Sequence, residues 1–552
     1  MIVPELRPWR AAGPHEARAA GAVRPRLARA ARAVAPQFAR VTRPKTWQYT
    51  AGAATAGLAL AAGVVTAVGP WDSMGQRTAE RDRAVAMEHA GGADHGRGSG
   101  GSGTGSGAPR PAPSAGSVLA GLGGTAGGAP DGVKAGPGGT ALADALGPLL
   151  DDPALGTRRA ASVVDLTTGE RLYGLDADVP LTPASTTKIA TAVAALTALG
   201  PDHRLTTRTA LEADTGELVL VGGGDPTLTA REDREDDGGT SRAGNGEDAE
   251  DPASPRTRAG SGEGPASLRT LAEKTAAALK KRDVRKVTLS YDTALYAGTE
   301  KHPIGDNENL ADVTALMADE ARTDDSTSGP APRVPDPAAE AARTFAGFLE
   351  EHGINASPPG PSKATDRADT LATVSSPPLS ALVERMLTAS DNDIAEALAR
   401  HTALATGEPA DFDGVSAAVP ARLEQLGMPV RGTRFHDGSG LDRTDRITAG
   451  LLTDLLAKAA DPARPELRPV LTGLPVAGFT GTLAGRYTDG AAGLVRAKTG
   501  TLTGVNTLAG TLVTADGRLL GFAFLASGTT DAWSAQAALD RAATTLVSCG
   551  CA

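Results

Sequence analysis

Three short polar motifs, widely separated along this chain of 552 residues, constrain its fold more than any other feature. In chain order they are Ser185-Thr186-Thr187-Lys188, Ser390-Asp391-Asn392 and Lys498-Thr499-Gly500. Each underlying pattern (S-x-x-K, S-x-N and K-T-G) occurs once in the sequence. Together the motifs supply a nucleophile, a base, a proton shuttle and a cation that suits a carboxylate. If they act as one site, segments 205 residues apart must fold against each other.

The first motif places a serine and a lysine one helical turn apart. Pro183, followed by apolar residues at helical spacing in residues 185–196, predicts a helix that begins at about Ser185. On such a helix Ser185 and Lys188 share one face. The helix macrodipole and the free backbone N–H groups favour negative charge there, which helps Lys188 lose its proton and stabilises an oxyanion. Ser185 is therefore a candidate nucleophile and Lys188 its general base.

The second motif lies between two apolar helical patterns, residues 379–387 and 394–398, which predicts a turn between helices. A turn can point side chains into a cleft. Ser390 is a candidate to relay a proton to a leaving amine. The Asn392 amide has both a donor and an acceptor and could hold Lys188 and the substrate carbonyl.

The third motif lies in residues 494–502, and strand-like residues 507–513 and 519–526 follow it, which predicts adjacent antiparallel strands. A cation at Lys498, on an edge strand beside the nucleophile, would bind a substrate carboxylate. Thr499 adds a hydroxyl, and Gly500 lets the substrate backbone approach closely. Such a site selects the C-terminal ends of peptides.

The complete trio resembles the motifs of class A β-lactamases and penicillin-binding proteins. The long separation of the first two motifs resembles the low-molecular-mass class C penicillin-binding proteins, the D-alanyl-D-alanine carboxypeptidase/endopeptidase family, whose members carry extra domains there. Further strings similar to that family are residues 220–226, 437–441, 478–483 and 549–551. The likeness covers roughly residues 141–552.

The resemblance implies an α+β fold with a split penicillin-binding protein/β-lactamase-like transpeptidase domain, an antiparallel sheet flanked by helices. We expect residues 141–208 and 368–552 to form this catalytic domain. Residues 209–367 would form one or more inserted domains with disordered loops. Residues 160–165 and 170–173 predict a hairpin ahead of the catalytic helix, so both ends of the likeness would build one sheet.

The resemblance also assigns roles to the motif residues. The catalytic residues would be Ser185 as the acylated nucleophile, Lys188 as its base, and Ser390 and Asn392 in the proton network. The substrate-binding residues would be Lys498, Thr499, Gly500 and Thr501. The backbone N–H groups of Ser185 and Thr501 would form the oxyanion hole.

The implied activity is that of a serine-type D-Ala-D-Ala carboxypeptidase, a hydrolase that removes the terminal D-alanine from peptidoglycan stem peptides through a serine ester. Cleavage of D-alanyl cross-links is a second implied activity, and β-lactams would acylate Ser185. Two alternatives stay open. A sensor would be acylated without turnover, and a β-lactamase would hydrolyse the drug, although no clear deacylating glutamate stands near Ser390 other than Glu396.

Other kinds of site fit the sequence less well. The eight histidines include no H-E-x-x-H, and the two cysteines, Cys549 and Cys551, cannot supply a four-ligand zinc site. We therefore expect no metal and no cofactor. Five histidines are interpreted as ordinary surface or packed residues: His203, His302, His352, His401 and His436.

The first 137 residues have the composition of a membrane-targeting segment followed by a flexible linker. Residues 1–45 carry ten basic residues against two acidic ones, and residues 46–71 are uncharged. This pattern predicts a basic cytoplasmic region and a transmembrane signal anchor that leaves the catalytic domain outside the cell membrane. The alternative is a signal peptide that is cleaved, giving a secreted protein. Residues 72–137 form a Gly/Ser/Pro-rich linker.

The chain after residue 71 has a net charge of −18, which argues against a nucleic-acid partner.

Overall fold

The structure, a computed structural model, describes residues 139–231, 264–487 and 490–548. The predictions for residues 1–45, 46–71 and 72–137 lie outside these residues. Among the residues that are described, no helix is both long enough and apolar enough to cross a bilayer.

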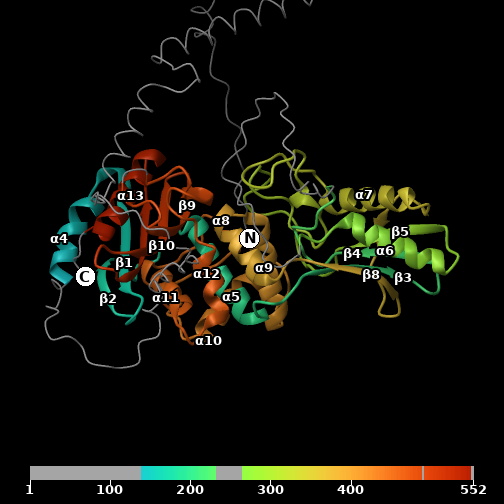
Figure 1. Ribbon diagram of the computed structural model, residues 1–552, viewed down its shortest axis with the longest axis horizontal. Coiled ribbons are helices and arrows are strands. Elements are labelled where there is room, and N and C mark those ends of the chain that lie inside the picture. The colour runs from blue at the N-terminus through green and yellow to red at the C-terminus, as the bar shows by residue number, and fades with distance from the viewer. Residues whose placement is uncertain (1–138, 232–263, 488–489, 549–552) are drawn as a thin grey trace, which may run out of the picture. The chain divides into compact units, whose positions relative to one another are not determined.

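A five-stranded antiparallel sheet brings the two ends of the described chain together (Figure 1). Its strand order is β2-β1-β11-β10-β9. The strands are β2 (Arg171–Leu175), β1 (Arg158–Asp165), β11 (Leu519–Ser527), β10 (Val505–Val513) and β9 (Val495–Leu502). Strand β1 pairs with β11 in antiparallel register, so residues more than 350 positions apart are neighbours. The expected hairpin, the three C-terminal strands and the edge position of the K-T-G strand are confirmed.

Both faces of this sheet are buried. Successive side chains of a strand point to opposite faces, so each strand contributes to two core clusters. Ala160 and Val164 of β1 join one core cluster, whereas Ala161 and Val163 join another. The first cluster is covered by α5 (Thr187–Leu199), α8 (Leu379–Ala389), α9 (Asn392–Thr406), α10 (Phe412–Gln425), α11 (Ala449–Ala460) and α12 (Arg468–Thr472). The second is covered by α4 (Gly139–Leu150) and α13 (Ala532–Ser548).

The inserted region has a sheet and a core of its own. Its sheet has the order β6-β5-β4-β3-β8, and β7 (Gly360–Pro361) pairs with β5. The strands are β3 (Thr206–Leu211), β4 (Glu217–Val221), β5 (Lys286–Asp292), β6 (Asn355–Ala356) and β8 (Asp369–Ser375). Helices α6 (Leu268–Lys281) and α7 (Pro337–Glu351) pack on it. The sheet includes residues 206–208 and 369–375, which the expected boundaries placed on the catalytic side.

The chain between β5 and α7 reaches back from the insert to the catalytic helices. The Ala297 N–H donates to the Ala410 carbonyl (3.1 Å), and the Ala311 N–H donates to the Asp393 carboxylate (3.0 Å). Arg333 forms an ion pair with Asp393 at 3.0 Å, and both side chains are buried. We call residues 293–336 the returning segment. It brings the insert into contact with α9, the helix that begins at the second motif.

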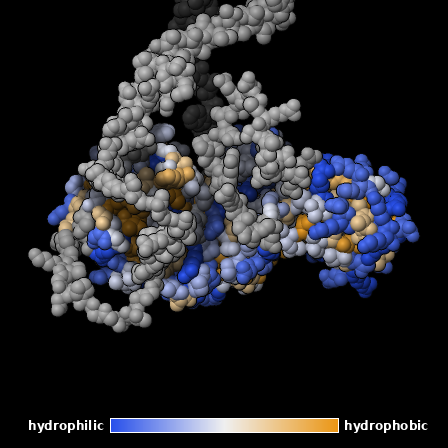
Figure 2. All heavy atoms as spheres, in the orientation of Figure 1, coloured by the Kyte–Doolittle hydropathy of each residue, from blue (hydrophilic) through white to orange (hydrophobic). Residues whose placement is uncertain are grey.

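The exposed surface differs over the molecule. In the view of Figure 2, the spheres over the insert are mostly hydrophilic, with few orange residues among them. A hydrophilic surface of this kind suits a domain whose buried residues already form its core.

Candidate active site

Ser185 lies in a tight turn immediately before α5. The turn is the 3-10 helix η2 (Ala184–Thr186), so α5 begins two residues later than the sequence predicts. The Pro183 carbonyl accepts hydrogen bonds from the hydroxyls of Thr186 (2.7 Å) and Thr507 (2.8 Å), which fasten the turn to β10. Ala184 has a φ of 48°, an unfavourable conformation for a residue with a Cβ. Surrounding contacts therefore hold the candidate nucleophile in a strained turn.

The Lys188 side chain is fully buried beneath Ser185. Its Nζ lies 3.0 Å from Ser185 Oγ, 2.6 Å from Asn392 Oδ1 and 2.8 Å from the Ser439 carbonyl oxygen. Burial lowers the pKa of Lys188 to about 8, against the opposing effect of nearby carboxylates such as Asp437. A substantial fraction of this amine is therefore neutral near physiological pH.

The three neighbours of Lys188 suit a base. The Asn392 and Ser439 oxygens can only accept hydrogen bonds, so they take two N–H groups of a neutral amine. The nitrogen lone pair is then left for the third neighbour, the Ser185 hydroxyl. The arrangement directs proton transfer from Ser185 Oγ to Lys188 Nζ.

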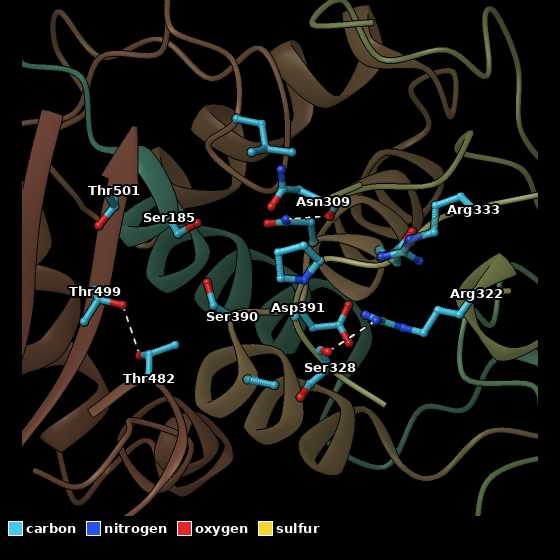
Figure 3. Close-up of a pocket in the computed structure, with 16 residues that line it drawn as sticks. Ser185, Asn309, Arg322, Ser328, Arg333, Ser390, Asp391, Thr482, Thr499 and Thr501 are labelled. Carbon is cyan, nitrogen blue, oxygen red and sulfur yellow. Dashed lines mark hydrogen bonds and ion pairs between the residues drawn. The ribbon is translucent and has the colours of Figure 1, made fainter. Parts of the chain in front are cut away.

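The Ser390-Asp391-Asn392 motif forms the predicted turn between two helices. Ser390 ends α8 with a left-handed φ of 58°, and the Asp391 side chain caps α9 by accepting from the Ile394 N–H (3.0 Å). Figure 3 shows the Ser390 side chain pointing toward Ser185. A hydroxyl in this place can pass a proton along the rim of the pocket.

The insert fixes the orientation of the Asn392 amide. Asn392 Nδ2 donates to the Asn309 carbonyl of the returning segment (2.8 Å). Because that carbonyl can only accept, the amide oxygen must face the other way, toward Lys188. Nothing in the sequence around Asn309 signals this role, since a backbone carbonyl carries no residue identity.

The Lys498-Thr499-Gly500 motif lies on the edge strand β9, beside β10. A Cβ at Gly500 would lie 2.1 Å from Thr507 Oγ1 and 3.0 Å from the Ser185 backbone nitrogen. Gly500 therefore permits the strand to approach the nucleophile turn.

Lys498 is a second buried lysine. Its Nζ donates to the Thr499 carbonyl (2.8 Å), and in the described part of the chain it forms no ion pair. Burial, and then the charge of Lys188, hold the pKa of Lys498 well below its usual range. An anion bound here would supply the missing counter-charge.

The pocket lies between these motifs and the returning segment (Figure 3). Five predicted site residues line it: Ser185, Ser390, Asn392, Thr499 and Thr501. Lys188 lies behind Ser185, and Lys498 and Gly500 flank Thr499 in β9. On the opposite wall, residues that the sequence did not nominate line the pocket: Asn309, Arg322, Ser328 and Arg333.

Two groups of buried ionisable side chains lie near the site. His302, Glu396 and Asp437 form one, and Glu320, Asp391 and Asp393 form the other. Neighbours already engage these groups: Asp437 contacts His302, Glu320 pairs with Arg322 and Arg385, and Asp393 pairs with Arg333. Glu396 accepts hydrogen bonds from the backbone of Gly438 and Ser439. Both groups therefore fit hydrogen-bonded structural clusters better than metal sites.

Comparisons with known proteins show the family and the fold to which this chain is similar. The model of the D-Ala-D-Ala carboxypeptidase 3 (S13) family matches residues 142–332 and 323–546. A carboxypeptidase DacB of Mycolicibacterium smegmatis is 34% identical over 74% of this chain and 84% of its own. A D-alanyl-D-alanine carboxypeptidase of an Actinomadura species is 31% identical over 69% of this chain and 80% of its own.

A solved structure extends the comparison to the fold. Penicillin binding protein 4 of Haemophilus influenzae has a TM-score of 0.56 and 20% identity, covering 73% of this chain and 98% of that one. The expected α+β fold is thereby confirmed. The predicted family is confirmed as well: the chain belongs to the D-Ala-D-Ala carboxypeptidase 3 (S13) family.

Proposed function

We propose that this protein is a serine DD-peptidase that removes the terminal D-alanine from peptidoglycan stem peptides through an acyl-enzyme on Ser185. The contact of Lys188 Nζ with Ser185 Oγ, Asn392 Oδ1 and the Ser439 carbonyl carries the proposal. Family membership and the names of the relatives, both carboxypeptidases, support the substrate class.

The first step forms an ester. Neutral Lys188 takes the Ser185 proton as Oγ attacks the carbonyl of the penultimate D-alanine. The backbone N–H groups of Ser185 and Thr501 stabilise the oxyanion. The C–N bond then breaks, the proton passes through Ser390 to the leaving amine, and D-alanine departs.

Water completes the cycle. It attacks the ester carbonyl while Lys188 again accepts a proton, and the stem peptide leaves with a free carboxylate. Ser185 regains its proton, so the enzyme returns to its starting state.

Recognition of the substrate terminus falls to the third motif. Lys498 is buried without an ion-pair partner in the described residues, and the hydroxyl of its neighbour Thr499 reaches the pocket. A bound anion would favour the charged form of Lys498. A terminal carboxylate placed here restores a favourable charge balance to Lys498.

The same chemistry extends to cross-links and drugs. In a cross-link the leaving amine belongs to a second stem peptide, and the acylation step is unchanged. A β-lactam is a strained cyclic amide whose carboxylate suits the same cation, and its leaving group stays tethered. The Haemophilus influenzae protein has been solved in complex with a β-lactam, which supports this extension.

The β-lactamase alternative fits the geometry poorly. Glu396 is fully buried, and its carboxylate accepts from the N–H groups of Gly438 (3.1 Å) and Ser439 (2.9 Å). Glu396 is therefore engaged by the backbone of residues 438–439, and it is not among the residues that line the pocket.

We also propose that the catalytic part acts outside the cell membrane. The basic residues 1–45 and the uncharged residues 46–71 support a retained anchor, with cleavage and secretion as the alternative. Immunoblotting of membrane and culture-medium fractions separates the two: a full-length membrane band supports the anchor, and a shorter species in the medium supports cleavage.

The activity is tested with purified full-length protein in detergent. Wild type and Ser185→Ala are incubated with a stem pentapeptide and with a cross-linked stem dimer, and products are measured by liquid chromatography and mass spectrometry. Free D-alanine from wild type alone is the expected result. Acylation by penicillin without peptide cleavage would instead identify a sensor.

A further inference from the structure

A continuous buried hydrogen-bonded chain connects the insert to the catalytic lysine. It begins at His302 of the returning segment, whose side chain is 2% exposed, and His302 Nε2 lies 2.9 Å from Asp437 Oδ2. Asp437 belongs to the turn that contains Ser439, and the Ser439 carbonyl contacts Lys188 Nζ at 2.8 Å. From the sequence, His302 was interpreted as an ordinary surface or packed residue.

Local geometry assigns the tautomer of His302. The Ile304 N–H donates to His302 Nδ1 (3.2 Å), so Nδ1 must carry a lone pair. In the neutral ring the proton is then on Nε2, which faces Asp437. His302 therefore donates its hydrogen bond to the Asp437 carboxylate.

Asp437 in turn fastens the backbone of its own turn. Its carboxylate accepts from the N–H groups of Gly440 (2.6 Å) and Asp442 (2.7 Å) and from the Ser439 hydroxyl (3.2 Å). Glu396 holds the same turn from α9 through the N–H groups of Gly438 and Ser439. These contacts direct the Ser439 carbonyl at Lys188.

We propose that His302 is a positioning residue for Lys188: by donating to Asp437, it holds the 437–442 turn so that the Ser439 carbonyl keeps the lysine aimed at Ser185. The proposal rests on the proposed function of Lys188 as the base. It gives the insert a part in catalysis beyond lining the pocket, because His302 is supplied by the returning segment.

The charges around His302 support an electrostatic part of this role. The carboxylates of Asp437, Glu396 and Asp442 face it, and the Phe412 ring of α10 packs edge-on against it with the centroids 5.3 Å apart. Burial alone would lower the pKa of His302, but the Asp437 hydrogen bond and the Glu396 charge outweigh it and raise that pKa. In the neutral ring the Nε2–H group still points at Asp437, and its dipole offsets part of the carboxylate charge that raises the pKa of Lys188.

Four variants of the full-length protein test the proposal. His302→Leu removes the donor, and His302→Gln keeps an amide N–H at the reach of Nε2. His302→Asn has the same amide on a side chain too short to reach Asp437. The control Phe412→Leu loosens the packing on His302 and leaves both of its hydrogen bonds in place.

The readouts are the second-order rate constant of acylation by a fluorescent penicillin, measured across pH, and the melting temperature. We expect His302→Leu and His302→Asn to lose about ten- to a hundredfold in the rate constant, with His302→Gln within about threefold of wild type. The rising limb of the pH profile of His302→Leu should move to higher pH, because unshielded carboxylates favour protonated Lys188. Phe412→Leu should leave the profile in place.

Several results would overturn the proposal. One is wild-type acylation in His302→Leu, or equal losses in the glutamine and asparagine variants. Another is a loss that follows the melting temperature while the pH profile stays fixed, which would mean that His302 only packs. If His302→Leu does not fold, the acylation rates of His302→Gln and His302→Asn still test the proposal, because only the glutamine amide can reach Asp437. Acylation of Ser185→Ala would instead refute the proposed function itself.

Discussion

The two walls of the pocket are built in different ways. The wall of Ser185, Thr499 and Thr501 comes from contiguous motifs on a turn and an edge strand, whereas the wall of Asn309, Arg322 and Arg333 comes from a long segment without regular strands or helices. In the proposed mechanism the first wall carries the chemistry, and the second wall holds parts of it in place, as Asn309 does by its hydrogen bond to Asn392. Substitutions should therefore affect acylation directly on the first wall and through stability and orientation on the second.

The largest effect is expected on the first wall, at Lys188. Lys188→Met keeps the length of the side chain and removes the base, so acylation by penicillin should fall by about 10²- to 10⁴-fold. Stopped-flow or gel-based acylation rates measure it, with circular dichroism to verify the fold. A folded Lys188→Met protein that acylates at the wild-type rate would show that another group takes the Ser185 proton.

On the second wall, Arg333→Met should act mainly on stability. It leaves the buried Asp393 carboxylate without its partner, which costs about 3–5 kcal/mol in the free energy of unfolding. The matched control is Arg343→Met, which breaks an exposed pair with Glu340 and should cost about 0–1 kcal/mol. Urea titrations compare them, and equal losses would contradict the anchoring role of Arg333.

The pH dependence sharpens the comparison because the proposed base, Lys188, belongs to the chemistry of the first wall. The base must be neutral, and its pKa is lowered to about 8, so raising the pH through that value deprotonates it. The acylation rate should rise about tenfold per pH unit below that value and level off above it. A rate that is flat from about pH 6 to pH 9 would contradict a titrating Lys188.

A smaller effect is expected at Gly500, where the two main elements of the first wall touch. Gly500→Ala places a methyl group against Thr507 Oγ1 and the Ser185 turn, which should cost about 1–3 kcal/mol and slow acylation. Gly347→Ala in α7 is the control, because nothing lies within 4 Å of its Cβ position. Thermal melts and acylation rates are compared, and identical behaviour of the two variants would contradict the close approach of β9.

The sequence predicted the first wall well because its signals are local. Periodic apolar residues predicted the helices around Ser390, and strand-like runs of residues predicted β9, β10 and β11. The start of α5 was placed two residues too early because a 3-10 turn, held by Thr507 from another element, takes its first residues. That contact is not visible in residues 183–188 themselves.

The second wall could not be predicted because its contacts join residues that are far apart in the sequence. Asn309 acts through a backbone carbonyl, and His302 through one hydrogen bond to a residue 135 positions away. Such contacts leave no periodicity and no motif. Residues 437–441 were singled out as a family-like string, yet their role emerged only from the contacts with Lys188 and Glu396.

The most direct test of the central claim is to locate the acyl group. Wild-type protein is incubated with penicillin, digested, and analysed by tandem mass spectrometry beside Ser185→Ala. We predict a single penicilloyl adduct on Ser185 in the wild type and none in the variant. An adduct on another residue, or an adduct that persists in Ser185→Ala, would contradict the assignment of Ser185 as the nucleophile served by Lys188.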